Sequence, residues 1–290
     1  MPMEWIDIAK DLCAGTVGGV AGIVAGHPLD TIKVRLQTQS HLTKRSSILQ
    51  TFRSIAAKEG VRGFYKGMLS PIISNAPINA VVFAIYGQAS RALAGDDPLT
   101  PGQQYLAGAL AGLAQVTFSA PAELVKIQMQ VATRASSQSS MQCAARIVRK
   151  YGVFKGLYHG WQLTVLRDVP AFGSYFFTYE VAKDLLSGGK DASTTTLLLA
   201  GGIAGSMSWV LTQPIDVLKT LAQSQRFEEH VSTRTLLKHH VRLEGWGFLT
   251  KGFGATVLRA FPVSAVTFLV YERMMEFMHI PDADNALHMM

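Results

Sequence analysis

Three charged residues interrupt segments of the chain that are otherwise free of charge. Arg167 and Asp168 break the stretch 156–179, and Arg259 breaks the stretch 252–271. Charges inside long apolar segments are costly in a membrane, so each one indicates a functional role. Arginine presents a planar fork to a carboxylate, and aspartate can pair with an ammonium group. The set therefore predicts a binding site for a small zwitterion.

The two arginines occupy equivalent positions, because each stands three residues before a proline. The matching position before Pro77 is Ser74. We therefore expect Ser74, Arg167, Asp168 and Arg259 to lie at one depth, near the middle of three apolar segments.

Composition limits what the rest of the chain can be. Of 290 residues 27 are basic and 20 acidic, a net charge of +7, and charged residues make up 16%, against roughly 25% in an average soluble protein. This excludes a disordered chain, a coiled coil and a nucleic-acid binder that relies on bulk charge. We expect no metal site and no enzyme, because the chain has two cysteines and no nucleophile–base pair, phosphate loop or zinc-ligand cluster.

Uncharged or nearly uncharged stretches indicate six membrane spans, since about 20 helical residues cross a bilayer. The stretches are 12–29, 67–90, 98–122, 156–179, 192–215 and 252–271. Six such stretches, with charges confined to the gaps, are atypical of the core helices of a soluble protein.

A phrase of proline, acid, lysine and glutamine occurs three times, 93 residues apart. The acid and lysine are three residues apart and share one helix face. The prolines can bend their helices so that the ends converge. The three copies are Pro28-Asp30-Lys33-Gln37, Pro121-Glu123-Lys126-Gln130 and Pro214-Asp216-Lys219-Gln223.

Each copy is followed by a polar, amphipathic segment (46–58, 139–150 and 232–243) and then by a further span. Each unit thus reads as span, surface helix, span. We predict an all-α membrane protein, a pseudo-threefold barrel of six transmembrane helices with three short surface helices. The repeats are 1–98, 99–191 and 192–280, with a C-terminal tail at 281–290.

These residues resemble the mitochondrial carrier family over essentially the whole chain. The resemblance implies a multi-pass, monomeric protein of the mitochondrial inner membrane that exchanges small solutes (antiport) by alternating access around one central cavity. Gly67, Gly160 and Gly252 resemble the family's cardiolipin sites, and helix N-termini attract phosphate. The excess of basic residues suits an anionic membrane surface. No nucleic-acid partner is expected.

The resemblance also implies two gates. On the matrix side the pairs are Asp30–Lys126, Glu123–Lys219 and Asp216–Lys33, braced by Gln37, Gln130 and Gln223. The cytosolic gate departs from the family pattern, because its three copies contain Tyr86 alone, then Tyr179, Glu180 and Lys183, then Tyr271 and Glu272. We therefore predict a weak cytosolic gate that is closed mostly by the tyrosines and apolar packing.

Ser74, Arg167, Asp168 and Arg259 match the substrate-contact level of the family, with Ile78 and Asn79 as companions. The pattern looks most like the carnitine/acylcarnitine and basic amino-acid branch. Arg167-Asp168-Val-Pro resembles the carnitine type, and Ile78-Asn79 resembles the basic amino-acid type. We expect a zwitterionic amine such as arginine, lysine, ornithine, carnitine or an acylcarnitine.

A second hypothesis belongs to a different class. The incomplete cytosolic gate would also suit a carrier-derived structural or lipid-binding subunit of a larger inner-membrane complex, with little or no transport. The charges kept within the spans favour transport, because they are costly to retain without a function.

Overall fold

A computed structural model describes residues 5–38, 47–94, 98–132, 139–188, 194–225, 227 and 231–279. Within these ranges the chain is helical and contains no strand, which confirms the predicted all-α class. Six helices are long, and each carries a proline in its interior. They are α1 (Trp5–Gln37), α4 (Leu69–Ala94), α5 (Pro101–Val131), α7 (Trp161–Ser187), α8 (Thr194–Ser224) and α10 (Phe253–His279).

Three surface helices form where the sequence predicts them. They are α2 (Ile48–Glu59), α6 (Ser140–Tyr151) and α9 (Thr233–Glu244). Ser47 and Ser139 begin the first two with capping boxes, in which the serine and the glutamine three residues later bond each other's backbone N–H. Each helix stops at a glycine with positive φ, such as Gly60, a conformation that favours glycine.

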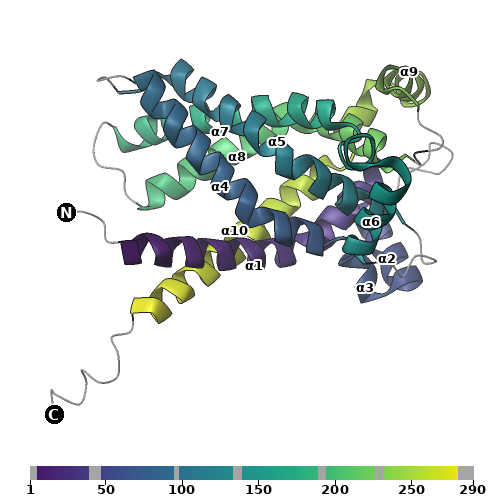
Figure 1. Ribbon diagram of the computed structural model, residues 1–290, viewed down its shortest axis with the longest axis horizontal. Helices are drawn as coiled ribbons and strands as arrows, with labels where there is room; N and C mark the ends of the chain where they lie inside the picture. Colours follow the sequence, from purple (N-terminus) through teal and green to yellow (C-terminus); the bar gives the residue numbers. More distant parts are fainter. Residues whose placement is uncertain are drawn as a thin grey trace, which may run out of the picture.

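Short turns connect the surface helices to the following long helices. They are α3 (Val61–Phe64), η1 (Val153–Leu157) and η3 (Trp246–Thr250). The surface helices and these turns gather at one end of the long helices (Figure 1). We call this the surface-helix end.

Glycines set how closely the long helices pack. On α1, Gly18 and Gly22 face α10, where a Cβ on Gly18 would lie 2.8 Å from the carbonyl oxygen of Thr267. On α5, Gly108 and Gly112 face α7, where a Cβ on Gly112 would lie 2.7 Å from the carbonyl oxygen of Asp168. Small residues four apart thus let two helix backbones approach closely.

Only two described segments, Val61–Ala94 and Trp246–Met278, are long and apolar enough to cross a membrane by length and composition alone. The other four long helices contain glycine, hydroxyl, amide or charged residues, several of which line the interior. The length of the uncharged stretches therefore locates these four helices better than their mean hydropathy does.

The proline in α5 leaves a backbone carbonyl without its helical partner, and a side chain supplies one. Pro121 has no N–H to donate to the carbonyl oxygen of Thr117, four residues earlier. The hydroxyl of Tyr158, in the turn after η1, donates to that oxygen at 2.8 Å. Nearby, the Ser70 hydroxyl of α4 donates to the carbonyl of Ala122 at 2.6 Å. Both bonds fasten the middle of α5 to neighbouring segments.

Candidate functional site

A central cavity of about 420 Å³ lies among the long helices, toward the surface-helix end. All six long helices line it. Each contributes at least one residue, in helix order Ile23, Ser74, Ser119, Arg167, Trp209 and Arg259. Its size lies in the range of pockets that bind small molecules.

Three ion pairs cross the floor of this cavity, and each connects two different repeats. They are Lys126 Nζ to Asp30 Oδ2 at 2.5 Å, Lys33 Nζ to Asp216 Oδ2 at 2.8 Å, and Lys219 Nζ to Glu123 Oε2. These are the pairings expected from the repeated phrase. We call the six residues the ion-pair ring. Because the pairs join the first helices of the three repeats to one another, they hold the bundle together at this level.

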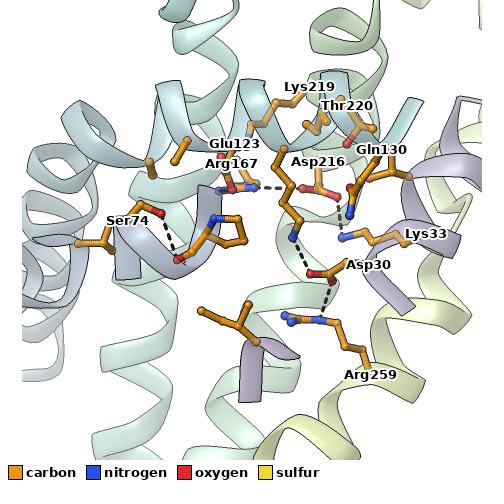
Figure 2. Close-up of a pocket in the computed structure, with 18 of the residues that line it drawn as sticks. Asp30, Lys33, Ser74, Glu123, Gln130, Arg167, Asp216, Lys219, Thr220 and Arg259 are labelled. Atoms are coloured by element: carbon orange, nitrogen blue, oxygen red, sulfur yellow. Dashed lines mark hydrogen bonds and ion pairs between the residues drawn. The ribbon is translucent and has the colours of Figure 1, made fainter. Parts of the chain in front are cut away.

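The second oxygen of each ring acid binds an arginine. Arg259 Nε lies 3.1 Å from Asp30 Oδ1. Arg167 spans two acids, with Nη2 at 2.8 Å from Glu123 Oε1 and Nη1 at 3.2 Å from Asp216 Oδ1. Figure 2 shows Arg259 below Asp30 and Arg167 beside Glu123. The predicted substrate-site arginines thus join the predicted gate in two ion-pair clusters, one around Asp30 and the other around Arg167.

Asp168 occupies a different position from the one expected for an ammonium partner. Its carboxylate receives hydrogen bonds from Arg167 and Gln115, both at 2.5 Å, and from the Ser119 hydroxyl at 3.4 Å. Its side chain is 2% exposed, whereas that of Glu123 is 28% exposed. Asp168 therefore orients Arg167 in this structure, and Glu123 is the acid most open to the cavity. The sequence places Asp168 beside Arg167 but does not show that it points between α5 and α7.

The three predicted positions on α4 differ in their surroundings. Ser74 and Ile78 line the cavity, and the Ser74 hydroxyl donates to the carbonyl of Pro71 at 3.3 Å. Asn79 is exposed outside the cavity lining and donates to Asn75 Oδ1 at 3.4 Å. Asn75 lines the cavity in its place, although no sequence pattern singled it out.

Sequence reasoning also missed Trp209, whose ring lies beneath two cations of the network. Lys33 Nζ is 4.6 Å and Arg259 Cζ 5.9 Å from its centroid, within cation–π range. A signal was present, because Trp209 stands seven residues before Asp216 and therefore on the same helix face. Ser119, four residues before Glu123, follows the same rule.

The predicted glutamine braces act unequally. Gln37 Nε2 donates to Asp216 Oδ2 at 3.3 Å and so touches the ion-pair ring. Gln130 instead donates to the Thr31 hydroxyl at 3.1 Å, and Gln223 donates to the carbonyl of His159 at 3.4 Å. The expectation that all three brace the pairs is therefore met by one. A fixed sequence offset does not fix the direction of a flexible amide.

The predicted cytosolic-gate residues lie at the other end of the long helices, each with a different neighbour. Tyr86 stacks on Phe176 with ring centroids 3.8 Å apart, Tyr179 stacks on Tyr175 at 6.3 Å, and Tyr271 packs near Gly18. Glu180 pairs with Lys183 of its own helix, and Glu272 is exposed. Tyr86 of the first repeat thus packs on an aromatic ring of the second, whereas Tyr179 stacks on a residue of its own helix.

The three repeats are shared with a known family. A family model described as "Mitochondrial carrier protein" matches residues 4–97, 97–190 and 190–281. The chain belongs to the mitochondrial carrier family. It is therefore a multi-pass transporter of the mitochondrial inner membrane.

Among relatives of this carrier are proteins named for two substrate types. The "Mitochondrial basic amino acids transporter" of Homo sapiens is 41% identical over 90% of this chain and 88% of the relative. The "Mitochondrial carnitine/acylcarnitine carrier protein" of Homo sapiens is 38% identical over 93% of this chain and 94% of the relative. A "Mitochondrial carnitine/acylcarnitine carrier-like protein" of Arabidopsis thaliana is 36% identical over 92% of this chain and 97% of the relative.

Proposed function

We propose that this carrier moves a zwitterionic amine-containing metabolite, and a basic amino acid such as arginine, lysine or ornithine in the first place. The observation that carries the proposal is the joint presence of Arg167, Arg259 and the accessible carboxylate of Glu123 around one central cavity. Relatives named for basic amino acids and for carnitine, at 36–41% identity, support the same chemical class.

Charge argues against two other substrate classes. Arg167 and Arg259 already face acids, so a polyphosphate would meet Asp30, Glu123 and Asp216 close to its phosphates. A dicarboxylate would meet the same repulsion. A zwitterion supplies both signs and suits a cavity in which acids and bases alternate.

Carnitine or an acylcarnitine is the second candidate, and a specific feature favours it. A smaller pocket of about 280 Å³ adjoins the cavity between α7 and α8 and is walled by Phe172, Tyr175 and Trp209 beside Arg167 and Asp168. Aromatic faces bind quaternary ammonium groups by cation–π attraction, and they also accept an acyl chain. A primary ammonium or guanidinium group would prefer the more accessible carboxylate of Glu123.

Exchange measured in liposomes tests the proposal. Purified carrier is loaded with unlabelled substrate, and uptake of labelled L-arginine, L-lysine, L-ornithine and carnitine is followed. We expect uptake of at least one of them, abolished in Arg259→Gln and retained in Asn79→Ala, a change outside the cavity lining. No uptake of any zwitterion, under conditions in which a control carrier is active, would reject the proposal in favour of a structural subunit.

We further propose that the carrier works as a monomer, catalyses no chemical reaction and binds cardiolipin on the matrix side. Positive φ is found at the glycine just before each of α4, α7 and α10, where backbone N–H groups suit a phosphate. These glycines are Gly67, Gly160 and Gly252. A thermal shift on adding cardiolipin to the delipidated carrier, reduced in Gly160→Ala, would support this. Sedimentation of the detergent-solubilised carrier tests the monomer.

A further inference from the structure

The two arginines of the proposed substrate site are already occupied by carboxylates of the ion-pair ring. Asp30 binds Lys126 through Oδ2 and Arg259 through Oδ1. Glu123 likewise binds Lys219 through Oε2 and Arg167 through Oε1. One oxygen of each acid therefore holds the matrix side closed, and the other holds an arginine that faces the cavity.

The third acid repeats this division. Asp216 Oδ2 binds Lys33, and Asp216 Oδ1 lies 3.2 Å from Arg167 Nη1. Because Asp168 also binds Arg167, this guanidinium serves three carboxylates. A substrate carboxylate that makes a bidentate pair with Arg167 must therefore displace a ring carboxylate, and one that takes the Nε edge of Arg259 must displace Asp30.

Displacement alone would be unfavourable, because it leaves a partly buried carboxylate oxygen without its cation. An ammonium group on the same ligand can take the place that the arginine left. We propose, on the basis of the proposed function, that a zwitterion binds this carrier by partner exchange. Its carboxylate replaces a ring carboxylate on Arg167 or Arg259, and its ammonium group takes the released oxygen of Glu123 or Asp30.

This assigns a second role to the ring acids. Besides closing the matrix side, Asp30 and Glu123 compete with the substrate for the arginines and so determine specificity. An amine without a carboxylate cannot release the arginine, and an acid without an ammonium group leaves a ring oxygen unpaired. Only a ligand with both groups replaces every broken pair.

Two variants that break the same ion pair separate this role from gate closure. Asp30→Asn and Lys126→Gln both abolish the Asp30–Lys126 pair. Asp30→Asn also frees Arg259, whereas Lys126→Gln leaves Asp30 with Arg259 as its only cation in the network. We expect pentanoate, an acid without a cationic group, to bind Asp30→Asn about three- to tenfold more tightly than wild type, and Lys126→Gln more weakly.

The experiment is a thermal-shift titration of the purified, detergent-solubilised carrier, which reports binding even when cycling is lost. The probes are L-arginine, its decarboxylated analogue agmatine, pentanoate as an acid without a cationic group, and carnitine. Wild type should bind a zwitterion at least tenfold more tightly than agmatine or pentanoate. In Asp30→Asn the advantage of the zwitterion over pentanoate should shrink, because no charged ring oxygen is left to pair at that position.

Glu123→Gln and Lys219→Gln form an equivalent pair at Arg167, should either variant at Asp30 and Lys126 fail to fold. Zwitterion binding to wild type, without tighter binding of pentanoate to Asp30→Asn or Glu123→Gln, would overturn partner exchange and leave the proposed function intact. Equal binding of agmatine and L-arginine would also overturn it. If no zwitterion binds any form that still melts cooperatively, the proposed function itself fails.

Discussion

The second repeat and the third carry the same pair of glycines on their first helix but use it differently. Gly108 and Gly112 of α5 lie directly against α7, with Phe172 and Asp168 within contact of where a Cβ would be. Gly201 and Gly205 of α8 have nothing among the described atoms within 4 Å of a Cβ. Threefold repetition in the sequence therefore does not give threefold repetition of helix contacts.

The first and third repeats each have internal ion pairs near their surface helix instead. Glu59, at the end of α2, pairs with Arg35 at 2.8 Å and Lys66 at 2.5 Å, and Glu244 pairs with Lys251 at 2.6 Å. The second repeat has Tyr151 at the position equivalent to Glu59. The second repeat is thus held within itself by the close approach of α5 and α7, whereas the first and third each carry ion pairs of their own at the surface-helix end.

A methyl group in the α5–α7 contact should have the largest effect. Gly112→Ala places a Cβ 2.7 Å from the backbone oxygen of Asp168, which cannot move without shifting Arg167. We expect a loss of about 1–3 kcal/mol in stability from overpacking, together with loss of exchange. Thermal melting and liposome uptake measure both. Gly205→Ala is the matched control, and an equal loss there would remove the distinction between the repeats.

The contact between α1 and α10 should be the next most sensitive. Gly18→Ala places a Cβ 2.8 Å from the carbonyl oxygen of Thr267, while Gly15→Ala on the same helix meets open space. We expect Gly18→Ala to lower the melting temperature and Gly15→Ala to leave it near wild type. Gly18 lies far along α1 from the ion-pair ring, so substrate affinity should survive in both. A large fall in affinity with Gly18→Ala would contradict this.

Removing one hydroxyl tests the fastening that is special to the second repeat. Tyr158→Phe leaves the Thr117 carbonyl, already without its helical donor at Pro121, unpaired. The expected cost is about 0.5–1.5 kcal/mol, read from the melting temperature. Tyr65→Phe is the control, because the Tyr65 hydroxyl makes no hydrogen bond to the described residues. Equal effects of the two changes would show that the hydroxyl bond is unimportant.

The smallest effect is expected at the matrix end of the first repeat. Burial alone would raise the pKa of Glu59, but hydrogen bonds and charge from Lys66 and Arg35 outweigh it and hold the pKa below its ordinary value. A lowered pKa stabilises the fold fully above the ordinary glutamate pKa, and this contribution is lost as the pH falls through the lowered one. Glu59→Gln should therefore melt earlier than wild type at neutral pH, with the difference shrinking in acid. A difference independent of pH would contradict the assignment.

Sequence repetition predicted most of the fold, because spacing fixes which residues share a helix face. The pairing of Asp30 with Lys126, and of their counterparts, came from the resemblance to the carrier family. What could not be predicted depends on side-chain direction and on the fit between helices. Asp168 binds Gln115 of α5 and lines the smaller pocket rather than the central cavity, and Asn75 lines the cavity where Asn79 was expected.

The network around the cavity also has an electrical consequence. Among the described residues it joins five cationic side chains to four carboxylates, counting Asp168, so its fixed charge is +1. If these protein charges do not move across the membrane during the cycle, they do no work against the membrane potential. Only the charge of the transported solute then counts. One elementary charge gains or loses about 2.3 kcal/mol per 100 mV. One-for-one exchange of two monocationic amino acids would thus be electrically silent, whereas one-way movement of lysine would follow the potential into the matrix.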